Sequence, residues 1–251
     1  MSEKSLSGKT VVVCGASRNL GALISETAAG EGANVVVHYN SDSSAAKAAD
    51  VVAAVEKIGT RAIAHQGDLS TSPGVTGLFD AAEAEFEQVH AVVNTAGKVI
   101  KKPMAEVTDD EYDEMFAVNS KAAFLVMREA SKRVADGGKI VTIVTSLLAA
   151  YAPGYSVYAG GKAPVEHFTR ALSKELMDRQ VSVNNVAPGP MDTPFFYPAE
   201  TDESVAFHKS QAMGGQLTAI KDIAPIVRFL LTEGWWINGQ TLFANGGYTT
   251  R

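Results

Sequence analysis

The sequence predicts one α/β domain built on a doubly wound parallel sheet of about seven strands, with helices on both faces. Short runs of β-branched and other apolar residues, such as residues 11–13 and 35–37, recur along the chain. Helical patterns separate these runs, and no linker, internal repeat or shift in composition divides the 251 residues. Strands that are apolar throughout are buried on both faces, and their alternation with helices is typical of a parallel sheet.

The individual elements follow from the same pattern. Strands are expected at residues 11–13, 35–37, 62–64, 91–93, 140–144, 181–186 and 240–244. Helices are expected at residues 20–30 and 44–58, from 72 to about 87, from 108 to about 134, and around Tyr158. Pro73 suits a first helical turn, and Thr108 with Glu111 forms a capping box. Pro164 lacks an N–H, so we expect it to bend its helix or to lie near the first turn.

One connection is too long for an ordinary turn in such a sheet. Residues 194–216 are rich in aromatic side chains at their start and polar afterwards. Connections of this length usually carry structure of their own or serve a function. We expect a helix here that acts as a lid over the substrate within the single domain of residues 1–251.

Composition excludes several classes of protein. Hydrophobic residues make up 46% and charged residues 20%, and the net charge of -6 argues against a nucleic-acid partner or an anionic membrane surface. The single Cys excludes an internal disulfide, and the five His show no metal-ligand spacing. Residues 1–10 are polar, without the apolar core of a signal peptide, and no run is long enough to span a membrane. We therefore expect a cytoplasmic, metal-free protein.

Tyr158 and Lys162 lie four residues apart on an expected helix and share one of its faces. A phenol has an ordinary pKa of about 10, and a neighbouring ammonium favours the phenolate and lowers that pKa. With a hydroxyl from Thr145 or Ser146 to hold a substrate oxygen, this set could move a proton to or from a carbonyl or alcohol. The spacing also occurs on ordinary surface helices, so its weight depends on the surrounding motifs.

Those motifs stand at the carboxyl ends of the strands, where doubly wound sheets bind their ligands. They are residues 15–21, 38–41, 68, 94–97, 145–146 and 188–193. In the first of them, Gly15 and Gly21 let the backbone approach a diphosphate, and the helix that follows supplies N–H donors. The G-x-G-x-x-G spacing is absent, so a plain strand-to-helix turn is the alternative.

Together these motifs resemble the short-chain dehydrogenase/reductase family over nearly the whole chain. The family's turn reads T-G-x-x-x-G-x-G, from which Cys14 and Asn19 depart, and Asn is among the residues that tolerate left-handed geometry. The other matching stretches are Asp68-Leu69, Asn94-Thr95-Ala96-Gly97, Asn119, Tyr158 with Lys162, Pro188-Gly189-Pro190-Met191-Asp192-Thr193 and Asn245-Gly246-Gly247. The chain is similar to the 3-oxoacyl-carrier-protein reductases and carbonyl reductases among its members. The resemblance implies a Rossmann-type fold and a nicotinamide cofactor.

The resemblance also implies residue roles. Tyr158 would exchange the proton, Lys162 would bind the nicotinamide ribose, and Asn119 would hold a water that connects Lys162 to solvent. The family's assisting hydroxyl falls on Thr145 by spacing and on Ser146 by residue type; we slightly favour Ser146 and retain both. The expected cofactor-binding residues are Gly15, Ser17, Arg18, Asn19, Leu20, Gly21, His38, Asn40, Ser41, Asp68, Leu69, Asn94, Ala96, Gly97, Tyr158, Lys162, Pro188, Gly189, Met191 and Thr193.

The cofactor choice depends on the end of the second strand. It reads His38-Tyr39-Asn40-Ser41, with no carboxylate before Asp42. NAD-preferring members usually carry an acidic residue there. Arg18 can meet a 2′-phosphate with a charge-assisted fork, and His38, Asn40 and Ser41 can add donors. We therefore favour NADP(H), with NAD(H) as the alternative.

Four aromatic residues are expected around the substrate: Tyr151, Tyr155, Phe195 and Phe196. Such walls suggest an apolar or aromatic carbonyl compound, although packing of the lid or of a subunit contact would explain some of them equally well. Lys101 and Lys102 could attract an acidic carrier or an acyl thioester, but a solvated charge pair is the simpler interpretation.

We thus expect reversible hydride transfer between NADP(H) and a ketone or secondary alcohol. The alternative enzyme is a 3-oxoacyl-thioester reductase acting on acyl-carrier-protein or coenzyme A substrates. A third alternative is a nucleotide-sensing protein that has lost catalysis, against which the intact set of Asn119, Tyr158 and Lys162 argues. The family commonly forms tetramers, so a homotetramer is implied.

Overall fold

Seven parallel strands form one sheet in the order β3-β2-β1-β4-β5-β6-β7. This computed structural model describes residues 5–250, so the interpretation of residues 1–10 and of the domain's two ends lies partly outside the described residues. The strands are β1 (Thr10–Cys14), β2 (Asn34–Tyr39), β3 (Ala62–Gln66), β4 (Val89–Asn94), β5 (Val134–Ile143), β6 (Ser182–Pro188) and β7 (Thr241–Ala244). The predicted doubly wound α/β fold is confirmed.

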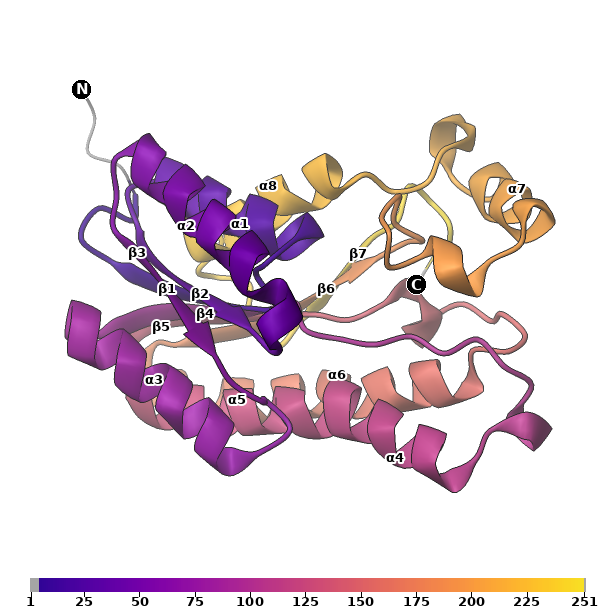
Figure 1. Cartoon of the computed structure of the whole chain (residues 1–251), viewed down its shortest axis with the longest axis horizontal. Helices are drawn as coiled ribbons and strands as arrows, with labels where there is room; N and C mark the ends of the chain where they lie inside the picture. The colour runs from indigo at the N-terminus through magenta and orange to yellow at the C-terminus, as the bar shows by residue number, and fades with distance from the viewer. Residues whose placement is uncertain (1–4, 251) are drawn as a thin grey trace.

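Helices cover both faces of the sheet (Figure 1). One layer contains α1 (Asn19–Gly30), α2 (Ala45–Ile58) and α8 (Ile220–Leu231). The other contains α3 (Ser72–Phe86), α4 (Asp109–Phe116), α5 (Ala122–Arg133) and α6 (Ser156–Glu175). Strands flanked on both sides are buried on both sides, which is why they are apolar throughout.

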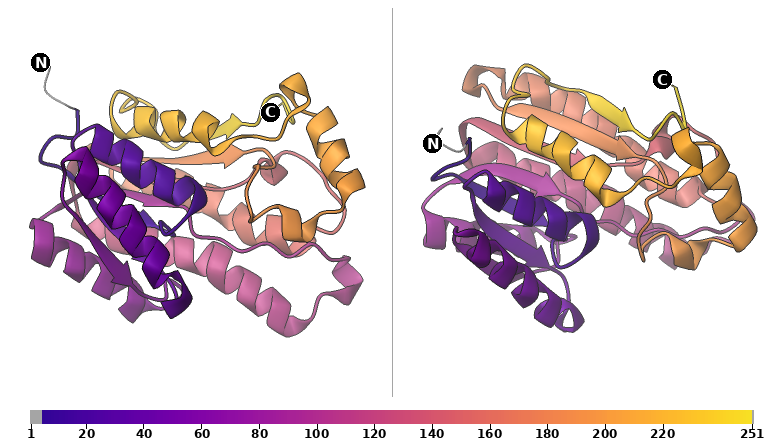
Figure 2. Two further views of the ribbon diagram at one scale, coloured as in Figure 1. Left: turned by 45° about the horizontal axis from the view of Figure 1, so that its top comes forward. Right: turned by 90° about the horizontal axis from the view of Figure 1, so that it is seen from above.

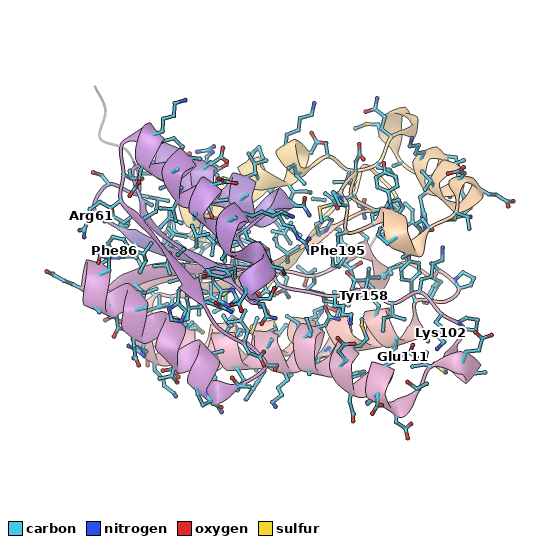
Figure 3. The ribbon with its side chains drawn as sticks, viewed as in Figure 1. Arg61, Phe86, Lys102, Glu111, Tyr158 and Phe195 are labelled. Carbon is cyan, nitrogen blue, oxygen red and sulfur yellow. The ribbon has the colours of Figure 1, made fainter. Side chains whose placement is uncertain are left out.

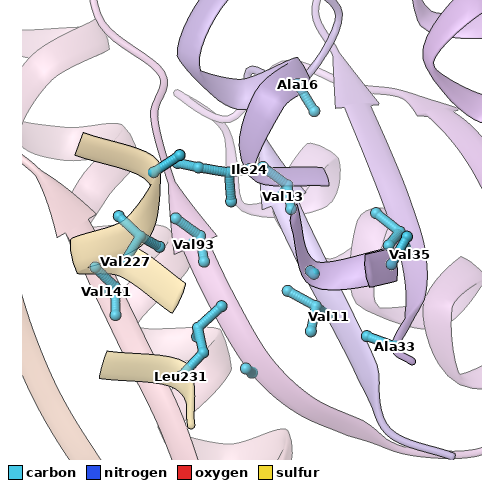
Figure 4. Close-up of a cluster of buried hydrophobic side chains, with 14 of the residues drawn as sticks. Val11, Val13, Ala16, Ile24, Ala33, Val35, Val93, Val141, Val227 and Leu231 are labelled. Carbon is cyan, nitrogen blue, oxygen red and sulfur yellow. The ribbon is translucent and has the colours of Figure 1, made fainter. Parts of the chain in front are cut away.

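The alternation of side chains along each strand separates two cores. Val11 and Val13 of β1 face α1 and α8, where they pack with Ile24 and Val227 (Figure 4). Val12, between them, belongs to the cluster on the opposite face. All five residues of β1 are buried, and burying one valine side chain stabilises the fold by about 1.5–3 kcal/mol.

Three elements differ from the sequence-based expectation. The helix α8 was not predicted; Pro225 lies inside it. The expected helix up to about residue 134 is present but contains a π-helical turn, Ala117–Lys121, between α4 and α5. Pro164 lies in the interior of α6, well beyond its first turn, and α6 nevertheless continues to Glu175.

The functional side chains gather beyond the carboxyl ends of the strands. Between β1 and β4 the chain order reverses, which creates the crevice where such sheets bind ligands. The segment 194–216 carries α7 (Asp202–Ser210), and Figure 2 shows this helix standing beyond the end of the sheet in both views. The helix expected in this segment is thus present. No helix in the described part of the chain is long and apolar enough to span a membrane.

Candidate active site

A cleft of about 830 Å³ opens at the ends of the first strands and reaches Tyr158 and Lys162. Most of the residues expected to bind a cofactor line it. They are Gly15, Ser17, Arg18, Asn19, Leu20, Gly21, His38, Asn40, Asp68, Leu69, Ala96, Gly97, Tyr158, Lys162, Met191 and Thr193. Pro188 and Gly189 line an adjoining smaller pocket instead. Asn94 is buried behind the cleft, where its Oδ1 accepts the backbone N–H of Ala96 at 3.0 Å.

The turn between β1 and α1 brings backbone to the floor of this cleft. Gly15 has a φ of 72° and Asn19 a φ of 50°, so the asparagine adopts the left-handed conformation expected of it. A Cβ at Gly21 would lie 2.4 Å from the carbonyl oxygen of Gly15. The first turn of α1 also has no side-chain cap among the described residues. A close backbone and free helical N–H groups are what a diphosphate requires.

Compared with the family's motifs, this chain lacks a hydroxyl at Cys14, which replaces Thr, and gains one at Thr95. Thr95 Oγ1 donates to the carbonyl oxygens of Cys14 at 2.8 Å and Gly15 at 3.2 Å. A threonine on β4's end therefore fixes the same turn from the neighbouring strand. The thiol of Cys14 is fully buried, which raises its pKa to about 12 and leaves it un-ionised.

The expectation that His38 adds a donor for a 2′-phosphate is wrong. The His38 side chain is buried, and its Nδ1 accepts the Gly15 N–H at 3.1 Å while its Nε2 bonds the Gly67 carbonyl oxygen at 2.8 Å. Burial lowers the pKa of His38 to about 4. The ring is therefore neutral and both of its nitrogens are engaged. His38 borders the cleft, but both of its ring nitrogens bond backbone groups, so the side chain supports the glycine turn and has no free donor for a phosphate.

The rest of the β2 end lines the cleft with neutral groups. Asn40 lines it as expected, and Ser44 does so without having been predicted. Ser41 does not line the cleft, which corrects the expectation: its Oγ pairs with Ser43 Oγ at 2.9 Å as the chain enters a short helical turn. Asp42 points to Gln66, whose Nε2 donates to Asp42 Oδ1 at 2.9 Å.

Tyr158 lines both the cleft and the adjoining pocket. Its neighbouring hydroxyl is that of Thr145, which acts to lower the pKa of the phenol and accepts the Leu147 N–H at 3.2 Å. Ser146 Oγ instead donates to the Ala187 carbonyl at 3.1 Å and accepts from Asn245 Nδ2 at 3.0 Å. The geometry therefore favours Thr145 over Ser146, against the slight preference taken from residue type.

Lys162 follows Tyr158 by one helical turn, and its side chain is buried. Its Nζ donates to the Ile143 carbonyl oxygen at 3.0 Å, and a Cβ at Gly97 would lie 3.2 Å from the same nitrogen. Asn119, in the π-helical turn, is buried with its amide bonded to the backbone of Lys98: Oδ1 accepts at 3.2 Å and Nδ2 donates at 2.8 Å. Asn119 thus fixes the loop that passes Lys162.

Burial sets the protonation of this pair. It raises the pKa of Tyr158 to about 12, although the Thr145 hydroxyl acts in the opposite direction. The expected lowering of the Tyr158 pKa by Lys162 is therefore not found. Burial also lowers the pKa of Lys162 to about 8. Near neutrality Tyr158 holds its proton, as a proton donor must.

The adjoining pocket has mostly apolar walls. Tyr155, Phe195 and Phe196 line it as expected, and Figure 3 shows Phe195 on the segment above Tyr158. Tyr151 was expected there, but its side chain is fully exposed on the loop before α6 and does not line the pocket. Sequence reasoning missed two residues that also line it: His208, which lies on α7, and Tyr248, which directly follows Asn245-Gly246-Gly247.

Thr193 marks where the cleft and the pocket meet. Its Oγ1 is buried and has no hydrogen-bond partner among the described residues. A buried hydroxyl without a partner costs free energy, so it points to a group that a ligand brings.

Known proteins align with this chain over nearly its full length. The family described as enoyl-(acyl carrier protein) reductase matches residues 15–249. A short-chain type dehydrogenase/reductase of Picea abies is 40% identical over 96% of this chain and 93% of its own. An NADPH-dependent aldehyde reductase-like protein, chloroplastic, of Arabidopsis thaliana is 36% identical over 97% and 95%. The crystal structure of a Burkholderia cenocepacia protein with bound NADP has a TM-score of 0.96 and 51% identity, covering 100% of this chain and 97% of that one.

Proposed function

The chain belongs to the short-chain dehydrogenase/reductase family of oxidoreductases, and from that premise we propose that it reduces a ketone or aldehyde with NADPH. The observation that carries the proposal is Tyr158, protonated and with the Thr145 hydroxyl beside it in the same pocket, at the junction of a dinucleotide-sized cleft and a mostly apolar pocket. Relatives that act with NADPH or bind NADP support the choice of cofactor.

Each residue of the site fits one part of this reaction. NADPH supplies the hydride when it is bound. Tyr158 donates its proton to the carbonyl oxygen as negative charge develops there, and Thr145 holds that oxygen with a second hydrogen bond. Thr193 offers its unpartnered hydroxyl to the carboxamide of the nicotinamide. The lid function of residues 194–216, the homotetramer and the cytoplasmic location stay part of the same proposal.

Turnover with three substrate types tests the proposal. NADPH oxidation would be followed with an aryl ketone, an aryl aldehyde and a 3-oxoacyl-coenzyme A. Reduction of the ketone or aldehyde supports it, whereas reduction of the thioester alone would favour the acyl-thioester alternative.

Lys102, one of the two lysines considered as an attraction for an acidic carrier, is paired with Glu111 at 2.9 Å (Figure 3).

Arg18 should decide between the two nicotinamide cofactors. It lines the cleft and is exposed, and no carboxylate from the end of β2 lines the cleft beside it. Losing a charge-assisted contact to the 2′-phosphate costs about 1.5 kcal/mol, so Arg18→Ala should weaken NADPH binding about tenfold and NADH binding little. Fluorescence titration with both cofactors measures this. Arg61→Ala, at the opposite end of the sheet, is the matched control (Figure 3). Equal losses for NADPH and NADH would contradict the role of Arg18.

Lys162 should make NADPH binding depend on pH. Its lowered pKa of about 8 means that the ammonium is present below this pH and is lost as the pH rises through it. Because the ammonium has more donors than the amine, the dissociation constant of NADPH should increase several-fold between about pH 7 and pH 9. Lys162→Met should bind more weakly at pH 7 and show no such step. A flat wild-type profile over this range would contradict the assignment.

A further inference from the structure

Glu200 is a buried carboxylate at the edge of the substrate pocket. Its side chain is 0% exposed and accepts Lys101 Nζ at 2.6 Å. The hydroxyls of Tyr155 and Ser204 also donate to it, and His208 Nε2 lies 3.5 Å from its Oε2. Burial alone would raise the pKa of Glu200, but these hydrogen bonds and the Lys101 charge outweigh it and lower the pKa. Glu200 is therefore ionised near neutrality.

These contacts join three segments that form the pocket wall. Lys101 comes from the loop after β4, Tyr155 from the start of α6, and His208 from α7. Lys101 Nζ also lies 5.4 Å from the centre of the Tyr155 ring. Tyr155 and His208 line the pocket, and Lys101 lines the adjoining cleft. The Lys101 charge thus lies behind the pocket wall, next to the pocket-lining ring of Tyr155, and Glu200 balances it.

The pocket itself offers no charge to a ligand. Among the described residues that line it there is no lysine, arginine, aspartate or glutamate. Burial lowers the pKa of its one histidine, His208, whose Nδ1 bonds the Tyr248 hydroxyl at 3.0 Å. Two other lysines of the same loop are engaged, Lys98 with Glu114 and Lys102 with Glu111. A carboxylate entering the pocket would have no free cation to meet.

We propose that Glu200 sets the specificity of this pocket: by neutralising Lys101 it reserves the pocket for uncharged carbonyl compounds and excludes those that bear a carboxylate. Burying an unpaired carboxylate is strongly unfavourable, so the wild-type pocket rejects it. Removing only the negative charge of Glu200 leaves Lys101 as an unpaired cation that can bind one. This inference rests on the proposed carbonyl reduction.

A matched substrate pair tests it. Para-formylbenzamide and para-formylbenzoate have nearly the same shape, but only the second carries a charge. The ratio of their kcat/KM values, amide over benzoate, would be measured with NADPH for wild type, Glu200→Gln, Lys101→Met and Lys101→Met/Glu200→Gln. The wild-type ratio should favour the amide. Glu200→Gln should lower that ratio about tenfold or more, the factor expected for a new charge-assisted contact. The double variant should restore it because no cation remains.

Glu111→Gln is the control, because it frees Lys102 outside the pocket and should leave the ratio unchanged. Calorimetric binding of benzamide and benzoate to the enzyme–NADPH complex gives the same comparison without turnover. If wild type reduces neither aldehyde, the proposed function fails while these binding ratios still test the inference. A Glu200→Gln variant that binds NADPH but leaves both ratios unchanged would overturn it. An equal shift of these ratios in Glu111→Gln would also overturn the inference.

Discussion

Tyr158→Phe should lower kcat for carbonyl reduction about 1,000-fold, within the range that a positioned general acid contributes. The phenol is buried, and its pKa, raised to about 12, keeps it protonated at neutral pH. Phenylalanine keeps the ring and its packing near Tyr155, 6.2 Å away between ring centres, and removes only the proton donor. NADPH binding should therefore change little.

Two measurements on this variant separate chemistry from folding. Single-turnover rates report the chemical step, and fluorescence titration reports whether NADPH still binds. A variant that binds NADPH and turns over at near the wild-type rate would show that another group supplies the proton. A variant that has lost NADPH binding would show that Tyr158 holds the cleft together.

Thr145→Val should mainly lower kcat, whereas Ser146→Ala should mainly lower the stability of the fold. The Thr145 hydroxyl acts on the Tyr158 phenol, so its loss removes one donor to the developing oxyanion and should lower kcat about 100-fold. Because Thr145 also accepts the Leu147 N–H, the same change should cost about 1 kcal/mol of stability. Ser146 bonds Ala187 and Asn245 in the core, so Ser146→Ala leaves those groups unpaired and should cost about 1–3 kcal/mol of stability. Its kcat should stay close to wild type.

Steady-state kinetics and thermal unfolding of the two variants provide the comparison. If Ser146→Ala slows the reaction and Thr145→Val does not, the assignment of the assisting hydroxyl is reversed. If neither variant slows it, no hydroxyl at these two positions assists Tyr158.

The sheet could be predicted because its physical signal is local. Runs such as residues 11–13 are apolar on both faces, since helices cover both sides of each strand. The helix α6 and the capping box at Thr108 could likewise be predicted from the sequence. The helix α8 was missed because Pro225 lies inside it and suggests a break, whereas its apolar packing against the sheet outweighs the lost hydrogen bond.

The site was predicted in outline but not in its side-chain directions. His38 sits in a strand whose residues are buried on both faces, so alternation could not show that its ring bonds the backbone of Gly15 and Gly67. Thr145 and Ser146 are adjacent, and the short helical turn after β5 decides which one faces Tyr158. Glu200 pairs with Lys101, which lies 99 positions earlier in the chain, so no local spacing in the sequence reveals this network.

Carbonyl reduction by this protein is tested most directly by one reaction under single-turnover conditions. Wild-type enzyme, loaded with less than one equivalent of NADPH, would be mixed with an uncharged aryl aldehyde while the absorbance of the reduced nicotinamide is followed. We expect this absorbance to decay at a rate that rises with aldehyde concentration, and we expect Tyr158→Phe to slow the decay about 1,000-fold. Bound NADPH that persists in wild type across uncharged aldehydes and ketones would contradict carbonyl reduction.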